Sequence, residues 1–244
     1  CQKWSPKFFA EACGDFVYPM YPATRAELEK DPDAVAKPVS VAEAMERLDK
    51  GLPAYFRFLP LLHDAPALFD DINRDWLESR RGPLGTQSVY QLFMGCKDSA
   101  TSMHSAIANN FFVQAYGEKE WRIYPNSYNP AFHALSVRSA YFASEVNADE
   151  PDHARHPMFR YVDGYDVRLT AGDVLYVPPF FWHSVYNPTV SIGFGYRWLG
   201  LPSILRSSLT QTLMSFTATN PPLWEQTNER VNATKASGEA GFGN

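Results

Sequence analysis

The stretch Gly172-Asp-Val-Leu-Tyr-Val-Pro178, which leads to Trp182-His183, is the part of the sequence that decides the fold. Its apolar run, Val174 to Val177, predicts a short buried strand that the prolines at 178 and 179 end. His183 therefore follows a strand. The earlier stretch His104-Ser105-Ala106 places a second histidine in a similar position, after a strand and a turn over residues 95–103. Because barrel folds bind their ligands at strand mouths, we predict that the two histidines converge.

The sequence around these stretches is typical of an all-β protein. From Ser88 onward, short apolar and aromatic runs alternate with Gly, Pro and Asn, which predicts short strands separated by turns. The predicted strands are Ala54 to Leu59, Val89 to Met94, Asn110 to Tyr116, Glu120 to Tyr124, Asp166 to Thr170, Val174 to Val177 and Ser191 to Trp198. This set suits a mainly β jelly roll, the double-stranded β-helix. The long polar segment 126–164 is predicted to be an excursion over the barrel mouth.

Helices flank the predicted barrel. Ser40 and Glu43 predict a capping box for a helix that ends at Gly51, and a second helix is expected over about 66–79. Leucines at 205, 209 and 213 recur at helical spacing, which predicts a C-terminal helix over about 203–218 that either packs on the core or forms a homodimer surface. We therefore expect one domain over 1–226, with a helical part over about 1–80, a barrel over about 88–199 and this helix, followed by a loose tail over 227–244.

Length and composition narrow the class of protein. The chain has 244 residues, 45% of them hydrophobic, and a formal net charge of −5, which suits one globular domain with a full core. No apolar run of about 18 residues is present, so we expect no membrane span. The lysines and arginines are scattered, and we therefore expect no nucleic-acid partner. The three cysteines, Cys1, Cys13 and Cys96, have no metal-ligand spacing and are odd in number, which favours a cytoplasmic or other reducing compartment.

Two histidines of this kind suit a metal site. Two neutral imidazoles and one carboxylate hold Fe(II) and leave open positions for an oxidant and a co-substrate. His104 and His183 would supply the imidazoles, but the position expected for the carboxylate holds Ala106. Ser105 would point to the opposite face of an extended strand, and no acidic residue follows before Glu118.

The 126–164 segment offers one further source of a third ligand. His153 and His156 could fold back toward the metal, although a solvated loop pair is the simpler interpretation. The remaining histidines, His63 and His133, show no partner in the sequence.

Several motifs in order resemble the JmjC-type cupin family. The resemblance rests on His104-x-Ala106-x-x-x-Asn110-Phe111, Gly117-x-Lys119, Trp121-x-Ile-Tyr-Pro125, Gly172 to Pro178 and Trp182-His183. That family includes cupin-like Fe(II)- and 2-oxoglutarate-dependent oxygenases similar to the asparaginyl hydroxylase of hypoxia-inducible factor. Its His-x-Asp or His-x-Glu metal motif reads His-Ser-Ala in this chain. The resemblance implies a double-stranded β-helix that uses Fe(II) and 2-oxoglutarate.

The resemblance also implies roles for individual residues. His104 and His183 would be the catalytic iron ligands, with Ala106 at the vacant ligand position. Lys119, helped by Thr101, would hold the distal carboxylate of 2-oxoglutarate, and Asn110 would lie near this co-substrate. Each of these three has a structural alternative: Lys119 could be a solvated turn residue between two glutamates, Thr101 a turn residue, and Asn110 a residue that begins a strand.

Three functions remain open at this stage. The first is C–H hydroxylation of a peptide or protein side chain or of a small molecule, with water or another oxygen ligand at the third position. The second is halogenase-type chemistry, with chloride at the vacant iron position. The third is a catalytically inactive cupin binding module. Oxygenase chemistry in some form is the preferred interpretation. The aromatic residues expected at the mouth suit a peptide or a small apolar molecule, although alternation along the strands predicts that half of them belong to the core. These residues are Tyr90, Phe180, Phe181, Trp182 and Tyr186.

Overall fold

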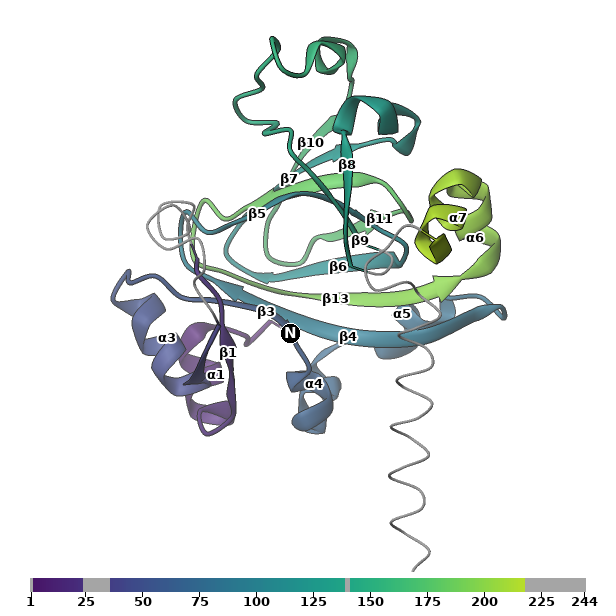
Figure 1. Cartoon of the computed structure of the whole chain (residues 1–244). Helices are drawn as coiled ribbons and strands as arrows, with labels where there is room; N and C mark the ends of the chain where they lie inside the picture. Colours follow the sequence, from purple (N-terminus) through teal and green to yellow (C-terminus); the bar gives the residue numbers. More distant parts are fainter. Residues whose placement is uncertain (1, 24–35, 139–140, 218–244) are drawn as a thin grey trace, which may run out of the picture.

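A computed structural model describes residues 2–23, 36–138 and 141–217. The six-stranded sheet consists, in spatial order, of β10 (Tyr165–Leu169), β7 (Lys119–Tyr124), β12 (Trp182–Tyr186), β5 (Ala100–Ala106), β9 (Tyr141–Ser144) and β8 (Ala134–Arg138). The five-stranded sheet consists of β11 (Val174–Val177), β6 (Asn109–Tyr116), β13 (Ser191–Gly200), β4 (Gly85–Gly95) and β3 (Tyr55–Leu59). All pairings within both sheets are antiparallel. Figure 1 shows the two sheets face to face, so the mainly β jelly roll is confirmed.

The interior of the barrel is filled from both sheets. Phe93 on β4 and Phe112 on β6 pack with Trp121 on β7 and Val185 on β12 in one buried cluster. Alternation of side chains along each strand sends these residues inward. On β13, the alternate residues Phe194 and Tyr196 belong to a different cluster, and the opposite face of the strand therefore looks into the barrel.

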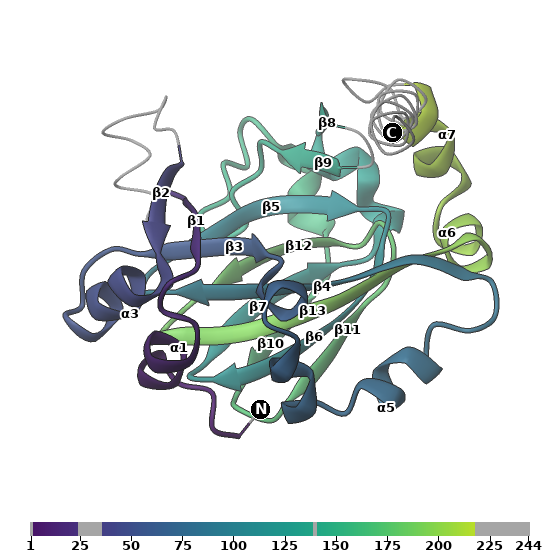
Figure 2. The same ribbon diagram turned by 90° about the horizontal axis from the view of Figure 1, so that it is seen from below.

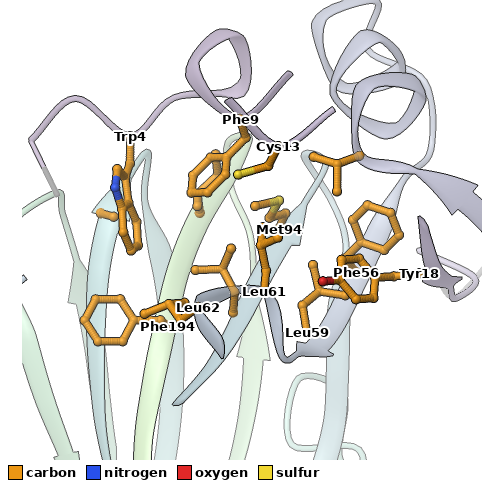
Figure 3. Close-up of a cluster of buried hydrophobic side chains, with 14 of the residues drawn as sticks. Trp4, Phe9, Cys13, Tyr18, Phe56, Leu59, Leu61, Leu62, Met94 and Phe194 are labelled. Atoms are coloured by element: carbon orange, nitrogen blue, oxygen red, sulfur yellow. The ribbon is translucent and has the colours of Figure 1, made fainter. Parts of the chain in front are cut away.

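The N-terminal helices cover the outer face of the five-stranded sheet. The helices α1 (Pro6–Cys13), α3 (Val41–Asp49) and α4 (Leu61–Asp64) lie beside β3 and β4, as Figures 1 and 2 show. Figure 3 shows side chains from these helices and from the sheet meeting in one apolar layer, in which Trp4 and Phe9 are edge to face at 5.3 Å between ring centroids. Fully burying one such side chain contributes about 1.5–3 kcal/mol, so this layer anchors β3 and β4.

The sequence predicted the α3 boundary from its cap. The side chain of Ser40 accepts a hydrogen bond from the backbone N–H of Glu43 at 3.1 Å, which satisfies one of the donors left open at a helix start. Gly51, with φ of +66°, follows the end of α3, so both predicted ends are confirmed. The strands β1 (Val17–Met20) and β2 (Lys37–Ser40), which form a separate pair, were not predicted.

Two predicted helices are each divided into two shorter pieces. The predicted helix over 66–79 is a 3₁₀ helix, η1 (Pro66–Asp71), and the α-helix α5 (Arg74–Ser79), with extended backbone at Ile72 between them. The predicted helix over 203–218 is α6 (Leu201–Ser207) and α7 (Leu209–Thr217), with extended backbone at Ser208. The helical spacing of apolar residues continues through both breaks. This spacing carries no information on a local change of backbone angle, so the sequence predicted one helix in each place.

The segment 126–164 is more ordered than an excursion loop. It contains η2 (Asn126–Phe132), β8, β9 and η3 (Pro157–Tyr161). Phe132 stacks on Trp182 of β12 at 4.8 Å between ring centroids, and Phe142 and Phe159 join the same cluster. This buried packing holds η2 and η3 against the six-stranded sheet, whose edge β9 and β8 extend, as the upper part of Figure 1 shows.

The predicted tail over 227–244 and the domain boundary at 226 lie outside the described residues. Within the described ranges, none of the helices is both long enough and apolar enough to cross a bilayer. Cys13 and Cys96 are buried free thiols, and Cys1 lies outside the described residues.

Candidate functional site

The structure brings the two histidines into contact. His104 on β5 and His183 on β12 are direct cross-strand partners. Their ring centroids lie 4.1 Å apart, with the ring planes inclined by 58°. Each side chain is 6% exposed. The convergence predicted from the sequence is therefore observed, but both histidines lie within strands that the sequence analysis did not predict.

Backbone carbonyls fix the proton on each imidazole ring. The Nδ1 atom of His104 lies 2.8 Å from the carbonyl oxygen of Ser102, and the Nδ1 atom of His183 lies 3.0 Å from that of Phe181. A carbonyl can only accept, so each Nδ1 carries a proton and donates it. Each Nε2 then keeps its lone pair, which is the tautomer that a metal-binding histidine with a backbone partner adopts.

The charge state of His183 agrees with this assignment. Burial lowers the pKa of His183 to about 4, and the nearby Arg197 lowers it further, while the hydrogen bond to the Phe181 carbonyl opposes both effects. The ring is therefore neutral at neutral pH. A metal ion requires a neutral imidazole, so no proton has to be displaced from Nε2 on binding.

Two contacts fix the turn before β12 against β5. Phe180 has φ of +63°, a left-handed conformation that is unfavourable for a residue with a side chain. Its backbone N–H donates to the carbonyl of Ala106 at 2.7 Å, and Ser105 Oγ donates to its carbonyl at 3.0 Å. Gln211 of α7 donates to Ser105 Oγ at 3.3 Å. Ser105 therefore points away from the metal-binding face, as predicted, and stabilises the turn that positions His183.

A small cavity lies next to the histidines. It has a volume of about 50 Å³ and is lined by His104, His183, Ala106, Ala108, Asn110, Phe58, Tyr141, Val177, Pro178 and Arg197. This is about the space of one or two water molecules, since each takes about 30 Å³ in the liquid. Among the described residues, no group of three or more His, Cys, Asp or Glu side chains is placed to hold a metal. Of the residues that line this cavity, only His104 and His183 have side chains of the types that commonly bind a metal, and Ala106 occupies the position predicted for a carboxylate.

The suggestion that His153 or His156 completes the site is wrong. Neither residue lines the cavity. The ring of His156 packs instead against His133 at 4.8 Å between centroids. His63 also has partners, because it packs between Phe69 and Tyr90. These ring contacts join residues that lie far apart in the chain, so the positions of the histidines in the sequence did not predict them.

Lys119 is buried, so its interpretation as a solvated turn residue is wrong. The side chain is 2% exposed, and burial lowers the pKa of its ammonium group to about 7. Lys119 Nζ donates a hydrogen bond to Asn187 Oδ1 at 2.6 Å and lies 5.4 Å from the centre of the Phe112 ring. Lys119 does not line the histidine cavity.

Aromatic rings connect the histidines to the Lys119 region. The Trp121 ring lies 5.6 Å from the His183 ring and 5.0 Å from the Phe112 ring. Trp121 and Phe112 are buried and belong to the interior cluster. A ligand that contacts both His183 and Lys119 would have to displace or pass these rings.

Thr101 and Asn110 have different surroundings. The hydroxyl groups of Thr101 and Tyr55 share a hydrogen bond of 2.9 Å, and Thr101 does not line the cavity. Asn110 on β6 is 5% exposed and does line the cavity. Its Oδ1 atom has no hydrogen-bond partner among the described residues. Asn110 is also the second residue of β6, so its position fits the structural alternative as well.

The sequence analysis missed Arg197 and Tyr141. Arg197 on β13 is the cross-strand partner of Asn110, and Tyr141 on β9 is the partner of Ala106. The Tyr141 ring stacks on the His104 ring at 5.0 Å. A signal for Arg197 was present, since the predicted strand Ser191 to Trp198 alternates aromatic residues with Gly193, Gly195 and Arg197. Two glycines on one face indicate close packing beneath that face.

Three of the five aromatic residues expected at the mouth are buried in the core, slightly more than the half that strand alternation predicts. Tyr90, Phe180 and Trp182 are at most 3% exposed and lie in hydrophobic clusters. Phe181 packs against the interior cluster. Tyr186 is 38% exposed, but it lines a separate cleft of about 360 Å³ on the outer face of the six-stranded sheet.

Comparisons with known proteins agree with the fold. A family model described as a cupin-like domain matches residues 9–209. JmjC domain-containing protein D of Dictyostelium discoideum is 32% identical over 94 residues, which cover 38% of this chain and 21% of that protein. Lysine-specific demethylase JMJ30 of Arabidopsis thaliana is 29% identical over 147 residues, which cover 60% of this chain and 34% of that protein.

A third relative is named for its association with another protein. Human HSPB1-associated protein 1 is 32% identical over 146 residues, which cover 57% of this chain and 29% of that protein. The aligned part of the chain thus spans from about a fifth to about a third of these three curated relatives.

Proposed function

The chain belongs to the cupin-like domain family, with relatives of JmjC type, and from this premise we propose that it is an Fe(II)- and 2-oxoglutarate-dependent oxygenase with a variant metal site. The observation that carries the proposal is the pair of imidazoles, whose Nδ1 atoms are both committed to backbone carbonyls. In this tautomer the Nε2 atom of each ring carries the lone pair, which is the form in which an imidazole binds a metal ion.

The residues present fit such a metal in part. His104 and His183 would supply two nitrogen ligands, and the remaining positions would be taken by the co-substrate and by a small exogenous ligand beside Ala106. When bound, Fe(II) with 2-oxoglutarate and oxygen supplies the oxidising power to hydroxylate a C–H bond. The chain itself contributes a nearly closed site, because both histidines are 6% exposed and Trp121 and Tyr141 pack against them.

Lys119 and Asn110 remain the proposed co-substrate residues. A buried lysine without an acidic partner is costly, and a carboxylate of 2-oxoglutarate would compensate its charge. Binding there would replace the hydrogen bond to Asn187 and require the rings of Trp121 and Phe112 to move. Asn110 already lies at the cavity. Thr101 is a weaker candidate, since its hydroxyl is bonded to Tyr55.

Specific observations favour each of the two alternatives. Halogenase-type chemistry, with chloride at the vacant position, is favoured by Ala106 and by the nearby positive charge of Arg197. A catalytically inactive binding module is favoured by the small volume of the cavity, about 50 Å³, and by the engagement of Lys119 with Asn187.

The proposed substrate is a peptide or protein side chain or a small molecule. The name of JMJ30, a lysine-specific demethylase, supports C–H oxidation on a protein. A wybutosine-synthesizing protein from mouse, 30% identical over 100 residues, is named for a tRNA modification. The net charge of −5 favours a substrate other than nucleic acid.

Two further features of the protein are proposed. Leu201, Leu205 and Leu209 of α6 and α7 are 62%, 43% and 59% exposed, which supports a homodimer through these helices. Light scattering across a concentration series tests the dimer. Two buried free thiols support a reducing compartment such as the cytoplasm.

One experiment separates the three functions. Fe(II) is titrated anaerobically into wild type, His104→Ala, His183→Ala and the control His153→Ala, whose histidine lies outside the cavity. Succinate production from 2-oxoglutarate is then measured with chloride and with gluconate. Metal binding that only the two cavity variants lose, with succinate formation in both salts, supports hydroxylation, whereas chloride-dependent formation supports halogenation. Absence of both metal binding and succinate would refute an oxygenase and leave the binding module.

A further inference from the structure

A second pair of histidines lies outside the cavity. His133 follows the end of η2, and His156 directly precedes η3. Their ring centroids lie 4.8 Å apart, with the ring planes inclined by 66°. His133 is exposed, whereas His156 is buried with 3% of its surface accessible. The pair therefore joins a buried imidazole to one that solvent can reach.

We propose that His133 and His156 form a second metal site, which binds one Zn(II) ion through an imidazole nitrogen of each ring. Imidazole is a preferred ligand of Zn(II), whose filled d shell imposes no fixed geometry. Among the residues that the structure describes, no group of three His, Cys, Asp or Glu side chains is placed to hold a metal. Water would therefore take the remaining positions. The site is independent of the proposed function, since neither histidine lines the cavity beside Ala106.

The spacing of the two rings fits one shared ion. An imidazole nitrogen lies about 2.0–2.1 Å from Zn(II), and the ring centroid lies roughly 1 Å beyond that nitrogen. Two rings on one ion, with ligand angles between about 90° and about 110°, therefore have centroids about 4.5–5.2 Å apart. The observed distance between His133 and His156 is 4.8 Å. The rings would thus need little movement to bind the same ion.

The buried ring provides an independent indication of a ligand. The Nδ1 atom of His156 is buried and has no hydrogen-bond partner among the described residues. Buried polar atoms are nearly always hydrogen-bonded, and an exception is often explained by a water molecule or an ion. A neutral imidazole keeps a lone pair on one of its two nitrogens, which a metal ion can accept. A Zn(II) ion at Nδ1 would satisfy this atom.

The backbone at the other histidine is strained. His133 is the residue that ends η2, and its φ of +46° and ψ of 58° lie in the left-handed region. At a helix end this conformation is usually adopted by glycine, which has no side chain to oppose it. Strained positions are retained where surrounding contacts hold them, and they cluster at functional sites. A ligand role for the His133 side chain would account for a histidine at this position.

A carboxylate beside the pair favours a cation. Hydrogen bonds from the backbone N–H groups of Arg155 and Ala154 hold the pKa of Asp152 below its usual value, and the charge interaction with His156 lowers it further. Asp152 is therefore ionised at neutral pH. The nearest basic side chain on this turn, that of Arg155, is paired with Glu145 at 2.6 Å. The local charge next to His156 thus suits a positive ion.

A Zn(II) ion at this pair would link η2 to η3. Phe132, next to His133, stacks on Trp182 at 4.8 Å between ring centroids. Phe159 of η3 packs edge to face on Phe132 at 5.5 Å. An ion that binds the folded protein and not the unfolded chain stabilises the fold. The site would therefore strengthen the aromatic packing behind the strand that carries His183.

The binding test uses the full chain with His104→Ala and His183→Ala, so that the cavity pair cannot contribute. Zn(II) is titrated against a chromogenic chelator into this background, alone and with His133→Ala or His153→Ala added. His133 is exposed, so its replacement leaves the core packing unchanged. His153 is the matched control, because it lies on the same turn, which the hydrogen bond from His156 N–H to the Asp152 carbonyl closes at 2.7 Å.

The expected result is a selective loss of affinity. Zn(II) affinity should fall on the order of tenfold or more with His133→Ala and stay unchanged with His153→Ala. Equal affinity in all three proteins, or a loss with His153→Ala only, would refute the pair as the site.

Thermal unfolding provides a second readout with the same proteins. Saturating Zn(II) should raise the unfolding midpoint of the background protein, and it should leave the midpoint unchanged once His133→Ala is added. A background midpoint that does not respond to Zn(II), or an equal rise in both proteins, would refute the link between η2 and η3.

Crystals of wild type grown with Zn(II) separate this inference from the proposed function. We expect an anomalous zinc peak about 2.0–2.1 Å from a nitrogen of both His133 and His156. A peak there and none between His104 and His183 would support this site and count against the proposed iron site. A peak only between His104 and His183 would overturn this inference and leave the proposed function.

Discussion

Replacement of Lys119 by methionine should make the protein more stable. Methionine has a similar length and no charge, so Lys119→Met removes a buried ammonium group and keeps most of the packing. Burial lowers the pKa of Lys119 from 10.5 to about 7. One pKa unit corresponds to about 1.4 kcal/mol, so the buried charge costs the folded state at most about 5 kcal/mol at neutral pH.

The expected gain is smaller than this limit. Methionine loses the hydrogen bond to Asn187 Oδ1 and the contact of the ammonium group with the Phe112 ring. An unsatisfied buried acceptor costs about 1–3 kcal/mol. We therefore expect the free energy of unfolding to rise by about 1–3 kcal/mol at pH 7.

The effect should depend on pH in a defined direction. Between pH 7 and 10.5 the unfolded lysine carries a proton that the folded lysine has lost, so the stability of wild type rises with pH across this window. The advantage of Lys119→Met should be largest at pH 7 or below and should vanish toward pH 10.5. Other titrating groups are common to both proteins and cancel in the difference.

Urea unfolding at several pH values between 6 and 10 measures this difference. Lys97→Met, at an exposed turn position, is the control and should change stability little at any pH. A Lys119→Met protein that is less stable than wild type at pH 7, or a gain that does not vary with pH, would refute the buried-charge argument. If Lys119 holds a carboxylate of 2-oxoglutarate, the same variant should also lose co-substrate binding while it gains stability.

Three other substitutions test separate features. Ala106→Asp should tighten Co(II) binding by about tenfold or more, as isothermal titration would measure, and a similar gain in the neutral Ala106→Asn would contradict the role of the added charge. Ser40→Ala should lower the free energy of unfolding by about 1 kcal/mol through loss of the helix cap, and an unchanged urea midpoint would mean that the cap contributes nothing. Gly117→Ala places a Cβ 1.9 Å from the carbonyl oxygen of Val190 at φ of +67°. It should lower the thermal midpoint far more than Gly51→Ala, because Gly51 has a similar φ of +66° but an added Cβ there would have no atom within 4 Å. Equal effects of the two substitutions would show that backbone strain, and not the steric clash, sets the loss of stability.

The fold class could be predicted from the amino-acid sequence, because the signals for it are local. All of the predicted strands appear in the structure, since apolar runs ended by Gly, Pro or Asn predict short strands irrespective of their partners. The cap at Ser40 was likewise visible, as it depends on residues three apart. The order of motifs around His104 and His183 indicated the family, and with it the expectation of two convergent imidazoles.

The set of side chains that line the cavity depends instead on how the strands pair in the folded barrel. Strand β5, with the sequence Ala-Thr-Ser-Met-His-Ser-Ala, has no apolar alternation, so its pairing with β12 and β9 defines it as a strand. The pairing of β5 with β9 sets Tyr141 opposite Ala106. The pairing of β6 with β13 brings Asn110 and Arg197 to the cavity. Lys119 does not line this cavity. Cross-strand contacts join residues far apart in the chain, and their register depends on the packing of the whole barrel. For that physical reason, the positive charge beside the two histidines could be found only after folding.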